Sequence, residues 1–185
     1  MFGKIDNLVW CLYTVIKLSL TRTHMPLAFD GLFEKTLIIV KPDGVQRGLV
    51  GEVVKRLETK GLKIVGLKMM RLDDAVLREH YAHHVTKSFY PGLEKFMQSS
   101  PVVAICAEGR NAVAAVRLIA GVTRGHEADA GTIRGDLSMG VCNVVHCSDT
   151  VDNAKLEVER FFREHEIFGY DKTEYLNVYM EDERI

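Results

Sequence analysis

One continuous apolar run limits the folds open to this chain more than any other stretch. It reads T-L-I-I-V over residues 36–40, lies between Lys35 and Lys41, and is stopped by P-D-G over residues 42–44. Runs without alternating polar residues are typical of a strand that is covered on both faces. The sequence therefore predicts a sheet that is buried between two layers.

Helical and extended patterns alternate along the rest of the chain. Strands are expected over 62–70, 102–107 and 141–146, and helices over 45–60, 73–84, 91–98, 111–119 and 152–163. The order β-α-β, β-α-β predicts an α/β (α+β) fold of the ferredoxin-like, split βαβ kind, with a four-stranded antiparallel sheet covered by helices. Residues 120–136 are expected to form a long loop, and residues 175–180 an edge strand.

The first 33 residues do not resemble the remainder. Their apolar run over 8–20 contains Lys17 and is too short for an ordinary membrane span. The T-R-T-H that follows is a poor signal-peptide cleavage site. We interpret residues 1–33 as an N-terminal extension, added by an early start assignment with Met25 as the alternative start, and 34–185 as the domain. A membrane or interface anchor is the second interpretation.

Charge and cysteine content narrow the class of protein. The formal net charge of -1 gives no global attraction to nucleic acid or acidic membrane, so any anion site must be local. The four cysteines include no C-x-x-C pair and are typical of reduced cytoplasmic thiols. Cys142 and Cys147 flank His146, but this spacing lacks the second ligand pair of a zinc site.

One histidine ends a second apolar run, which reads N-V-V-H-C-S-D over residues 143–149. The two valines before His146 favour a strand, and the small or polar residues after it favour the strand's end. Glu157 lies on a predicted helix and could accept a hydrogen bond from one ring nitrogen. This stretch alone does not decide between two interpretations of His146: a nucleophile, or a core histidine whose ring nitrogens are hydrogen-bonded.

Cationic and polar side chains gather in the irregular segments, where arginine forks and hydroxyls suit phosphate oxygens. They are Lys41, Tyr81, His83, His84, Arg117, Thr123 and Arg134, with an aromatic face at Phe89 and Tyr90. The alternative is a set of solvated surface residues, with Arg134 paired to Asp136 in a turn. We assign no role to His80, His126 or His165, because none has a partner pattern.

Together these stretches resemble the nucleoside diphosphate kinase family. The motifs lie over residues 36–49, 80–81, 89–93, 101–104, 131–136 and 143–149, with Glu157 beyond them, and the resemblance covers about 34–180. It implies an enzyme that transfers the terminal phosphoryl group of a nucleoside triphosphate to a nucleoside diphosphate and maintains triphosphate pools. Transfer would be ping-pong, through a phosphohistidine at His146, with Glu157 fixing the ring tautomer and Ser148 supporting that carboxylate.

The resemblance also implies the nucleotide contacts. The phosphate ligands are Arg117, Thr123, Arg134, Tyr81 and His84, the sugar ligands are Lys41 and Asn143, and the base contacts are Phe89 and Leu93. Mg²⁺ would be held mainly by the nucleotide phosphates, with no metal ligand from the protein. A cytoplasmic homo-oligomer, tetramer or hexamer, is implied, with no need for nucleic acid or membrane. A catalytically silent binding or regulatory protein on the same scaffold is the alternative.

The chain departs from the family pattern in a few places. Residues 137–142 are one residue shorter than in many members, so the second apolar wall of the base site falls at Gly140 or Val141. Gly125 and Ala130 replace common prolines, which predicts a more flexible loop. Cys147 and Thr150 also differ from the usual residues, but both are small enough to fit.

Overall fold

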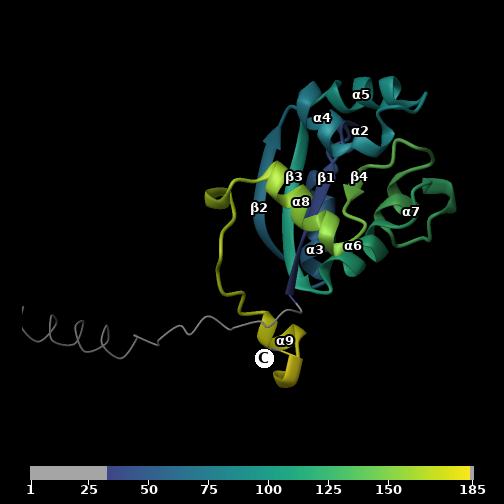
Figure 1. The fold of residues 1–185 in the computed structure, drawn as a ribbon. Helices are drawn as coiled ribbons and strands as arrows, with labels where there is room; N and C mark the ends of the chain where they lie inside the picture. The colour runs from purple at the N-terminus through teal and green to yellow at the C-terminus, as the bar shows by residue number, and fades with distance from the viewer. Residues whose placement is uncertain (1–32, 184–185) are drawn as a thin grey trace, which may run out of the picture.

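The computed structural model of the protein describes residues 33–183 (Figure 1). Apart from Phe33, the predicted extension and its possible anchor lie outside these described residues. Across the described part of the chain, no helix is both long enough and apolar enough to cross a membrane.

Four strands form one antiparallel sheet in the order β2-β3-β1-β4. The central strands are β1 (Phe33–Val40) and β3 (Val102–Arg110), and the edge strands are β2 (Lys63–Met70) and β4 (Val145–Cys147). This is the strand arrangement of the ferredoxin-like fold, so the predicted fold class is confirmed.

Different helices cover the two faces of the sheet (Figure 1). Leu37 and Ile39 of β1 lie in one buried cluster, and Ile38 and Val40 lie in the other, as alternation along a strand requires. The Ile38 face packs on α3 (Val50–Thr59) and α6 (Ala112–Ala120), and the Leu37 face packs on α4 (Asp74–His80), α5 (Tyr90–Gln98) and α8 (Val151–Phe161). Burial on both faces explains why the β1 run is apolar without interruption.

The helix predicted over 45–60 is in fact two helices. A short helix α2 (Pro42–Gln46) begins directly after β1. Helix α3 begins only after Gly48, whose φ of +68° is incompatible with a continuous helix. Proline suits the first helical position, since its missing N–H is not needed there and its φ is already helical. Pro42 therefore ends the strand, as expected, and also starts a helix.

The edge strand predicted over 175–180 is wrong, because that segment contains the short helix α9 (Tyr175–Val178). Tyr175 and Tyr179 are four residues apart, and their ring centroids lie 5.2 Å apart. The buried Tyr175 ring also packs on Phe33, and its hydroxyl donates to the carbonyl of Glu108 (3.1 Å). The four-residue spacing of Tyr175 and Tyr179 thus brings their rings together across one helical turn, not along a pleated strand.

Smaller differences lie at other boundaries. The helix predicted over 73–84 ends at His80 and continues as a 3₁₀ turn, and the long loop contains the helix α7 (Ile133–Leu137). Helix α8 starts one residue earlier than expected, since the hydroxyl of Thr150 accepts from the N–H of Asn153 (3.2 Å) and caps it. The 3₁₀ turns are η1 (Ala82–His84), η2 (Gly125–Glu127), η3 (Glu164–Glu166) and η4 (Glu181–Glu183).

Candidate functional site

Strand β4 is shorter than predicted because Val144 leaves the extended conformation. Its φ is +65°, a left-handed value that β-branched residues rarely adopt. The N–H of Val144 donates to Asp43 Oδ2 (3.0 Å), and its carbonyl accepts from the N–H of Lys41 (2.8 Å). These two bonds hold the strained turn. The neighbouring Asn143 Oδ1 accepts from Lys41 Nζ (2.7 Å), so the two predicted sugar ligands meet.

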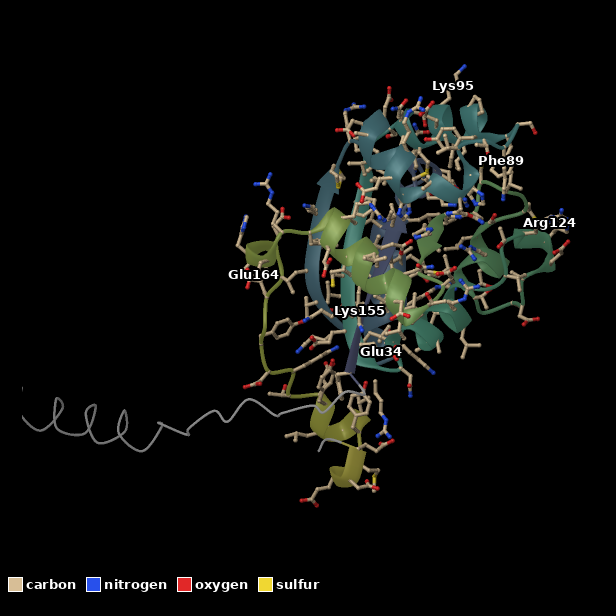
Figure 2. The ribbon with its side chains drawn as sticks, viewed as in Figure 1. Glu34, Phe89, Lys95, Arg124, Lys155 and Glu164 are labelled. Carbon is tan, nitrogen blue, oxygen red and sulfur yellow. The ribbon has the colours of Figure 1, made fainter. Side chains whose placement is uncertain are left out.

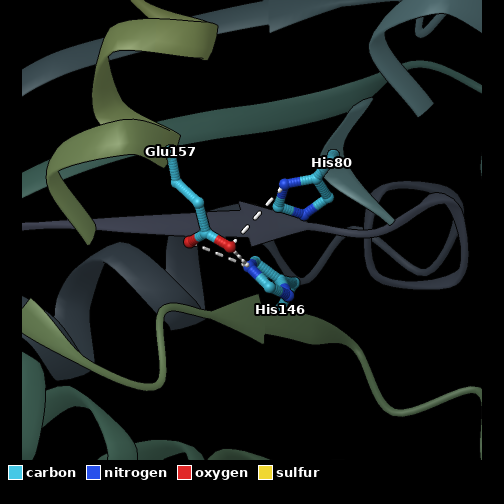
Figure 3. A group of neighbouring side chains, drawn as sticks. All are labelled: His80, His146 and Glu157. Atoms are coloured by element: carbon cyan, nitrogen blue, oxygen red, sulfur yellow. Dashed lines mark hydrogen bonds and ion pairs between the residues drawn. The ribbon is translucent and has the colours of Figure 1, made fainter. Parts of the chain in front are cut away.

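His146 lies on the face of the sheet that carries α4 and α8. It pairs with Ile39 across the β1–β4 ladder, and paired residues point to the same face. Helix α8 covers that face and presents Glu157, so that Nε2 of His146 lies 3.2 Å from each carboxylate oxygen (Figure 3). Within the described residues, no hydrogen bond reaches Nδ1 of His146. That nitrogen is therefore free to contact a ligand.

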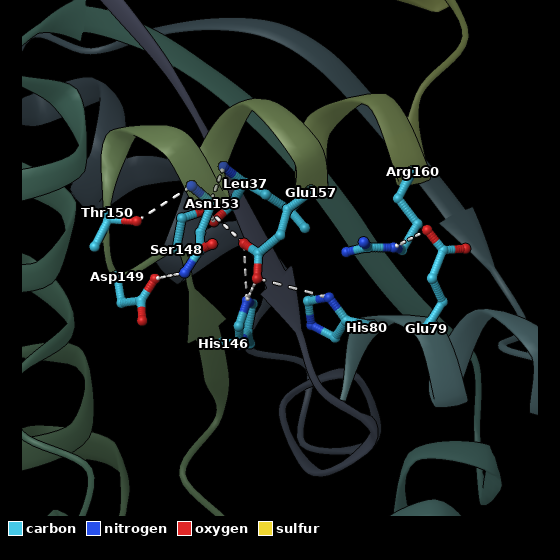
Figure 4. A network of polar contacts seen from close by, with 10 residues as sticks. All are labelled: Leu37, Glu79, His80, His146, Ser148, Asp149, Thr150, Asn153, Glu157 and Arg160. Carbon is cyan, nitrogen blue, oxygen red and sulfur yellow. Dashed lines mark hydrogen bonds and ion pairs between the residues drawn. The ribbon is translucent and has the colours of Figure 1, made fainter. Parts of the chain in front are cut away.

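The Glu157 carboxylate is held from two sides (Figure 4). The hydroxyl of Ser148 donates to Oε2 (2.6 Å) and accepts from the N–H of Leu37 (3.2 Å), which ties the carboxylate to the central strand. Burial would raise the pKa of Glu157, but the hydrogen bonds from His146 and Ser148 outweigh it and lower the pKa below its usual value. The carboxylate is thus ionised, and it orients the ring of His146.

His80 is the residue of this site that sequence reasoning missed. Its Nδ1 lies 3.7 Å from Oε1 of Glu157, and its ring meets the His146 ring edge to face, with centroids 4.5 Å apart. Burial and the neighbouring His146 lower the pKa of His80 to about 3, so the imidazole is neutral. The helical spacing of Leu77, His80 and Tyr81, all buried, is the signal that indicates an inward direction.

A cavity of about 720 Å³ opens beside His146. All nine predicted nucleotide contacts line it, although they come from six separate segments of the chain. They are Lys41, Tyr81, His84, Phe89, Leu93, Arg117, Thr123, Arg134 and Asn143. Glu157 and Ser148 are not in the lining and lie behind the His146 ring.

Part of the cavity lining is apolar. Phe89 is 51% exposed and meets the His84 ring edge to face, with centroids 5.2 Å apart. Figure 2 shows Phe89 on the same side of the molecule as Arg124, which lies in the loop before α7. Leu93 and Val141 also line this cavity, together with Phe96, which the sequence did not indicate. Of the two candidates for the second apolar wall, Val141 is the one in the lining.

Three cations line the cavity, and no carboxylate among the described residues does so. The terminal nitrogens of the buried Arg134 donate to the carbonyls of Gly121 (2.7 Å) and Val145 (2.8 Å), not to Asp136. Burial, and then the positive charge of Arg134, lowers the pKa of Lys41 to about 8. With the exposed Arg117, they make a site for an anion.

Two free thiols, Cys142 and Cys147, also line the cavity. Cys147 is buried, and burial raises the pKa of its thiol despite the positive charges of Arg134 and Arg117. Cys142 is exposed at the rim. His146 also lines the cavity, and it is the lining residue whose side chain is engaged by the Glu157 carboxylate.

Comparison with known proteins points to one family. The family model described as nucleoside diphosphate kinase matches residues 34–167. A nucleoside diphosphate kinase of Parabacteroides distasonis is 49% identical over 151 residues, which is 81% of this chain and 99% of that protein. One of Archaeoglobus fulgidus is 49% identical over 142 residues, 76% of this chain and 94% of that protein.

Solved structures agree with these matches. A halophilic nucleoside diphosphate kinase from Halobacterium salinarum in complex with CDP has a TM-score of 0.77 at 45% identity, covering 80% of this chain and 99% of that one. A transition-state mimic of the Borrelia burgdorferi enzyme, with bound vanadate and ADP, has a TM-score of 0.74 at 36% identity, covering 79% of this chain and 96% of that one.

Proposed function

The chain belongs to the nucleoside diphosphate kinase family, and we propose that His146 is the residue through which it transfers phosphoryl groups. It is a phosphotransferase that moves the terminal phosphate of a nucleoside triphosphate to a nucleoside diphosphate. The observation that carries the assignment is the position of His146, which lines the cationic cavity while Glu157 engages its Nε2.

The reaction runs in two mirrored steps. In the first, the lone pair of His146 Nδ1 attacks the terminal phosphorus, and the bond from that phosphorus to its bridging oxygen breaks. The diphosphate leaves with the electron pair of that bond, and the positive charge that develops on the ring is balanced by the Glu157 carboxylate. In the second step, a new diphosphate attacks the phosphohistidine and restores the free imidazole.

The cations of the cavity supply the electrostatic part of catalysis. Arg117, Arg134 and Lys41 meet the charge of the phosphate oxygens, and this is where most of the catalysis of phosphoryl transfer lies. The backbone carbonyls that hold Arg134 fix its guanidinium in advance of binding. The remaining polar lining residues, Tyr81, His84 and Thr123, complete the phosphate contacts.

Base recognition rests on stacking and is therefore broad. Phe89 offers its ring face at the rim, and Leu93 and Val141 offer apolar contact, so any base can lie between them. The Halobacterium relative was solved with a pyrimidine nucleotide and the Borrelia relative with a purine nucleotide. Lys41 and Asn143, which meet at 2.7 Å, are placed for the sugar hydroxyls.

We expect Mg²⁺ to bind in this site through the phosphates of the nucleotide and not through side chains of the protein. Among the described residues the cavity lining has no carboxylate, whereas Mg²⁺ prefers oxygen ligands, which the nucleotide phosphates supply. When bound, the ion neutralises phosphate charge. The chain's own part is to hold the phosphates with Arg117, Arg134 and Lys41.

We also propose a cytoplasmic homo-oligomer, tetramer or hexamer, built from a domain over 34–185 with residues 1–33 as an extension. Large apolar side chains that are well exposed support an assembly, among them Met139 (80%), Leu118 (75%) and Leu156 (57%). The start of β1 at Phe33 and of the family match at residue 34 support the domain boundary.

The test is phosphorylation of the protein by a triphosphate alone. A triphosphate with a labelled terminal phosphate should leave acid-labile label on wild type, and an added diphosphate should remove it. His146→Ala should take no label, whereas His126→Ala, which changes an exposed histidine, should label normally. Label and transfer that survive in His146→Ala would overturn the assignment, and nucleotide binding without any label in wild type would favour the silent binding protein.

A further inference from the structure

His80, His146 and Glu157 form a cluster of metal-ligating side chains (Figure 3). Each offers one ligand atom, and the three atoms lie within 4.8 Å of one another. Two edges of the triangle are 3.2 Å, from His146 Nε2 to Glu157 Oε1, and 3.7 Å, from His80 Nδ1 to the same oxygen. Within residues 33–183 this is the one group of its kind.

The second observation is that His80 has unmet hydrogen-bonding capacity. Its side chain is 1% exposed, and neither ring nitrogen has a hydrogen-bond partner among the described residues. Buried polar groups nearly always have partners, and leaving one without them costs free energy. Nδ1 faces the Glu157 carboxylate at a distance too long for a hydrogen bond. A metal ion that accepts the lone pair of Nδ1 would give that nitrogen a partner.

The donor set identifies the ligand. Two imidazoles and one carboxylate are the three protein ligands of many zinc sites, in which a fourth position stays open to water. Donors around tetrahedral zinc lie roughly 3.3 Å apart, so the two edges to Glu157 nearly fit, and the third is no longer than 4.8 Å. Imidazole favours zinc-class ions over Mg²⁺. The neighbouring cation, Arg160, is paired with Glu79 at 2.8 Å (Figure 4).

We propose that His80, His146 and Glu157 bind a divalent transition-metal ion of the zinc class, and that the bound ion stops His146 from acting as a nucleophile. A neutral imidazole carries one proton. To attack through Nδ1, the ring must hold that proton on Nε2, where Glu157 accepts it. The ion takes the lone pair of Nε2, so the proton moves to Nδ1 and the attacking lone pair is lost. No proton is gained or released.

The loss of catalysis rests on the proposed role of His146, whereas metal binding does not. The first experiment therefore measures binding alone. Full-length protein, free of metal and nucleotide, is titrated with Zn²⁺ against a chromogenic chelator. We expect one ion per chain.

Matched variants locate the ion. His80→Gln should weaken Zn²⁺ binding at least about tenfold, since even the loss of an outer-shell partner costs 10- to 100-fold. Glu157→Gln should do the same, which covers the case in which His80→Gln folds poorly. His83→Gln is the control, because His83 is exposed and outside the cluster, and its affinity should match wild type. Absence of binding, unchanged affinity in both variants, or loss of binding in Cys142→Ser would overturn the proposal.

A second experiment separates this proposal from the proposed function. Phosphoryl transfer with Mg²⁺ nucleotides is measured before Zn²⁺, with Zn²⁺, and after chelation. Bound Zn²⁺ should abolish phosphohistidine formation, and chelation should restore it. Full activity with the ion bound would overturn the inhibitory effect, whereas inactivity in the absence of Zn²⁺ would count against the proposed function and leave the binding result standing.

Discussion

Nε2 of His146 lies 3.2 Å from both carboxylate oxygens of Glu157, so one ionised side chain fixes the plane and the tautomer of the ring. Ser148 in turn binds the carboxylate at 2.6 Å and connects it to β1. The His146 ring is therefore positioned by a chain of contacts that ends in the centre of the sheet, and not only by the short strand that carries it.

Glu157→Gln should lower turnover by about 100-fold or more, which is the scale of a lost acid–base partner. A glutamine amide can donate to Nε2 and would favour the wrong tautomer, while the nucleotide contacts stay in place. The KM should therefore change little. Steady-state kinetics and the rate of phosphohistidine formation check this. Glu159→Gln, on the exposed face of the same helix, is the control, and equal rates in the two variants would contradict the role of Glu157.

Phe89→Ala should weaken nucleotide binding by about 1–3 kcal/mol, the value of one base–aromatic stack. Because Phe89 is 51% exposed, the variant should melt within a few degrees of wild type. Binding of one purine and one pyrimidine diphosphate, measured calorimetrically, should fall alike. Phe168→Ala, which removes another exposed phenylalanine, is the control. A loss confined to one base would show that Phe89 contributes selectivity instead.

Lys41 predicts a pH dependence of activity. Burial and Arg134 lower the pKa of Lys41 to about 8, so raising the pH through 8 removes its positive charge. A lost charge-assisted hydrogen bond to the nucleotide should reduce kcat/KM by about tenfold or more. In Lys41→Arg the decline near pH 8 should vanish, since a guanidinium stays charged. Lys155→Arg, at an exposed position, should keep the decline. A decline near pH 8 that survives in Lys41→Arg belongs to another group.

Gly125→Ala should destabilise the protein by about 1–3 kcal/mol, as overpacking does. A Cβ at this buried position would lie 2.2 Å from the carbonyl oxygen of Ser138, which no backbone contact tolerates. Gly140→Ala, where a Cβ meets open space, should stay within about 0.5 kcal/mol. Urea denaturation of both variants checks the difference. Equal stabilities would mean that the backbone around Ser138 yields to the added methyl group, and would contradict the prediction.

The fold could be predicted wherever one local pattern decides the structure. The uninterrupted β1 run indicated burial on both faces, and both faces are covered. Pro42 and Tyr175 were harder, because proline ends a strand and starts a helix equally well, and spaced aromatics suit a strand or a helical turn. In both cases tertiary contacts decide between two locally acceptable structures.

The site, like the fold, could be predicted from the sequence only in part. The cavity residues could be named from motifs, but their depth and partners could not. Val144 reads as a strand residue, and only its bonds to Asp43 and Lys41, about a hundred positions away, force it into the left-handed region. His80 offers no pairing signal, because its neighbours His146 and Glu157 are joined to it only by the packing of three elements.

The two backbone bonds at Val144 also bear on how the protein can vary. They fix the register of β4 immediately before His146, so the length of the preceding segment is uncoupled from the position of the His146 ring. Insertions and deletions over residues 138–142 would then reshape the cavity around Val141 and leave the His146 ring where it is. The shorter segment predicted from the sequence would be compatible with this arrangement.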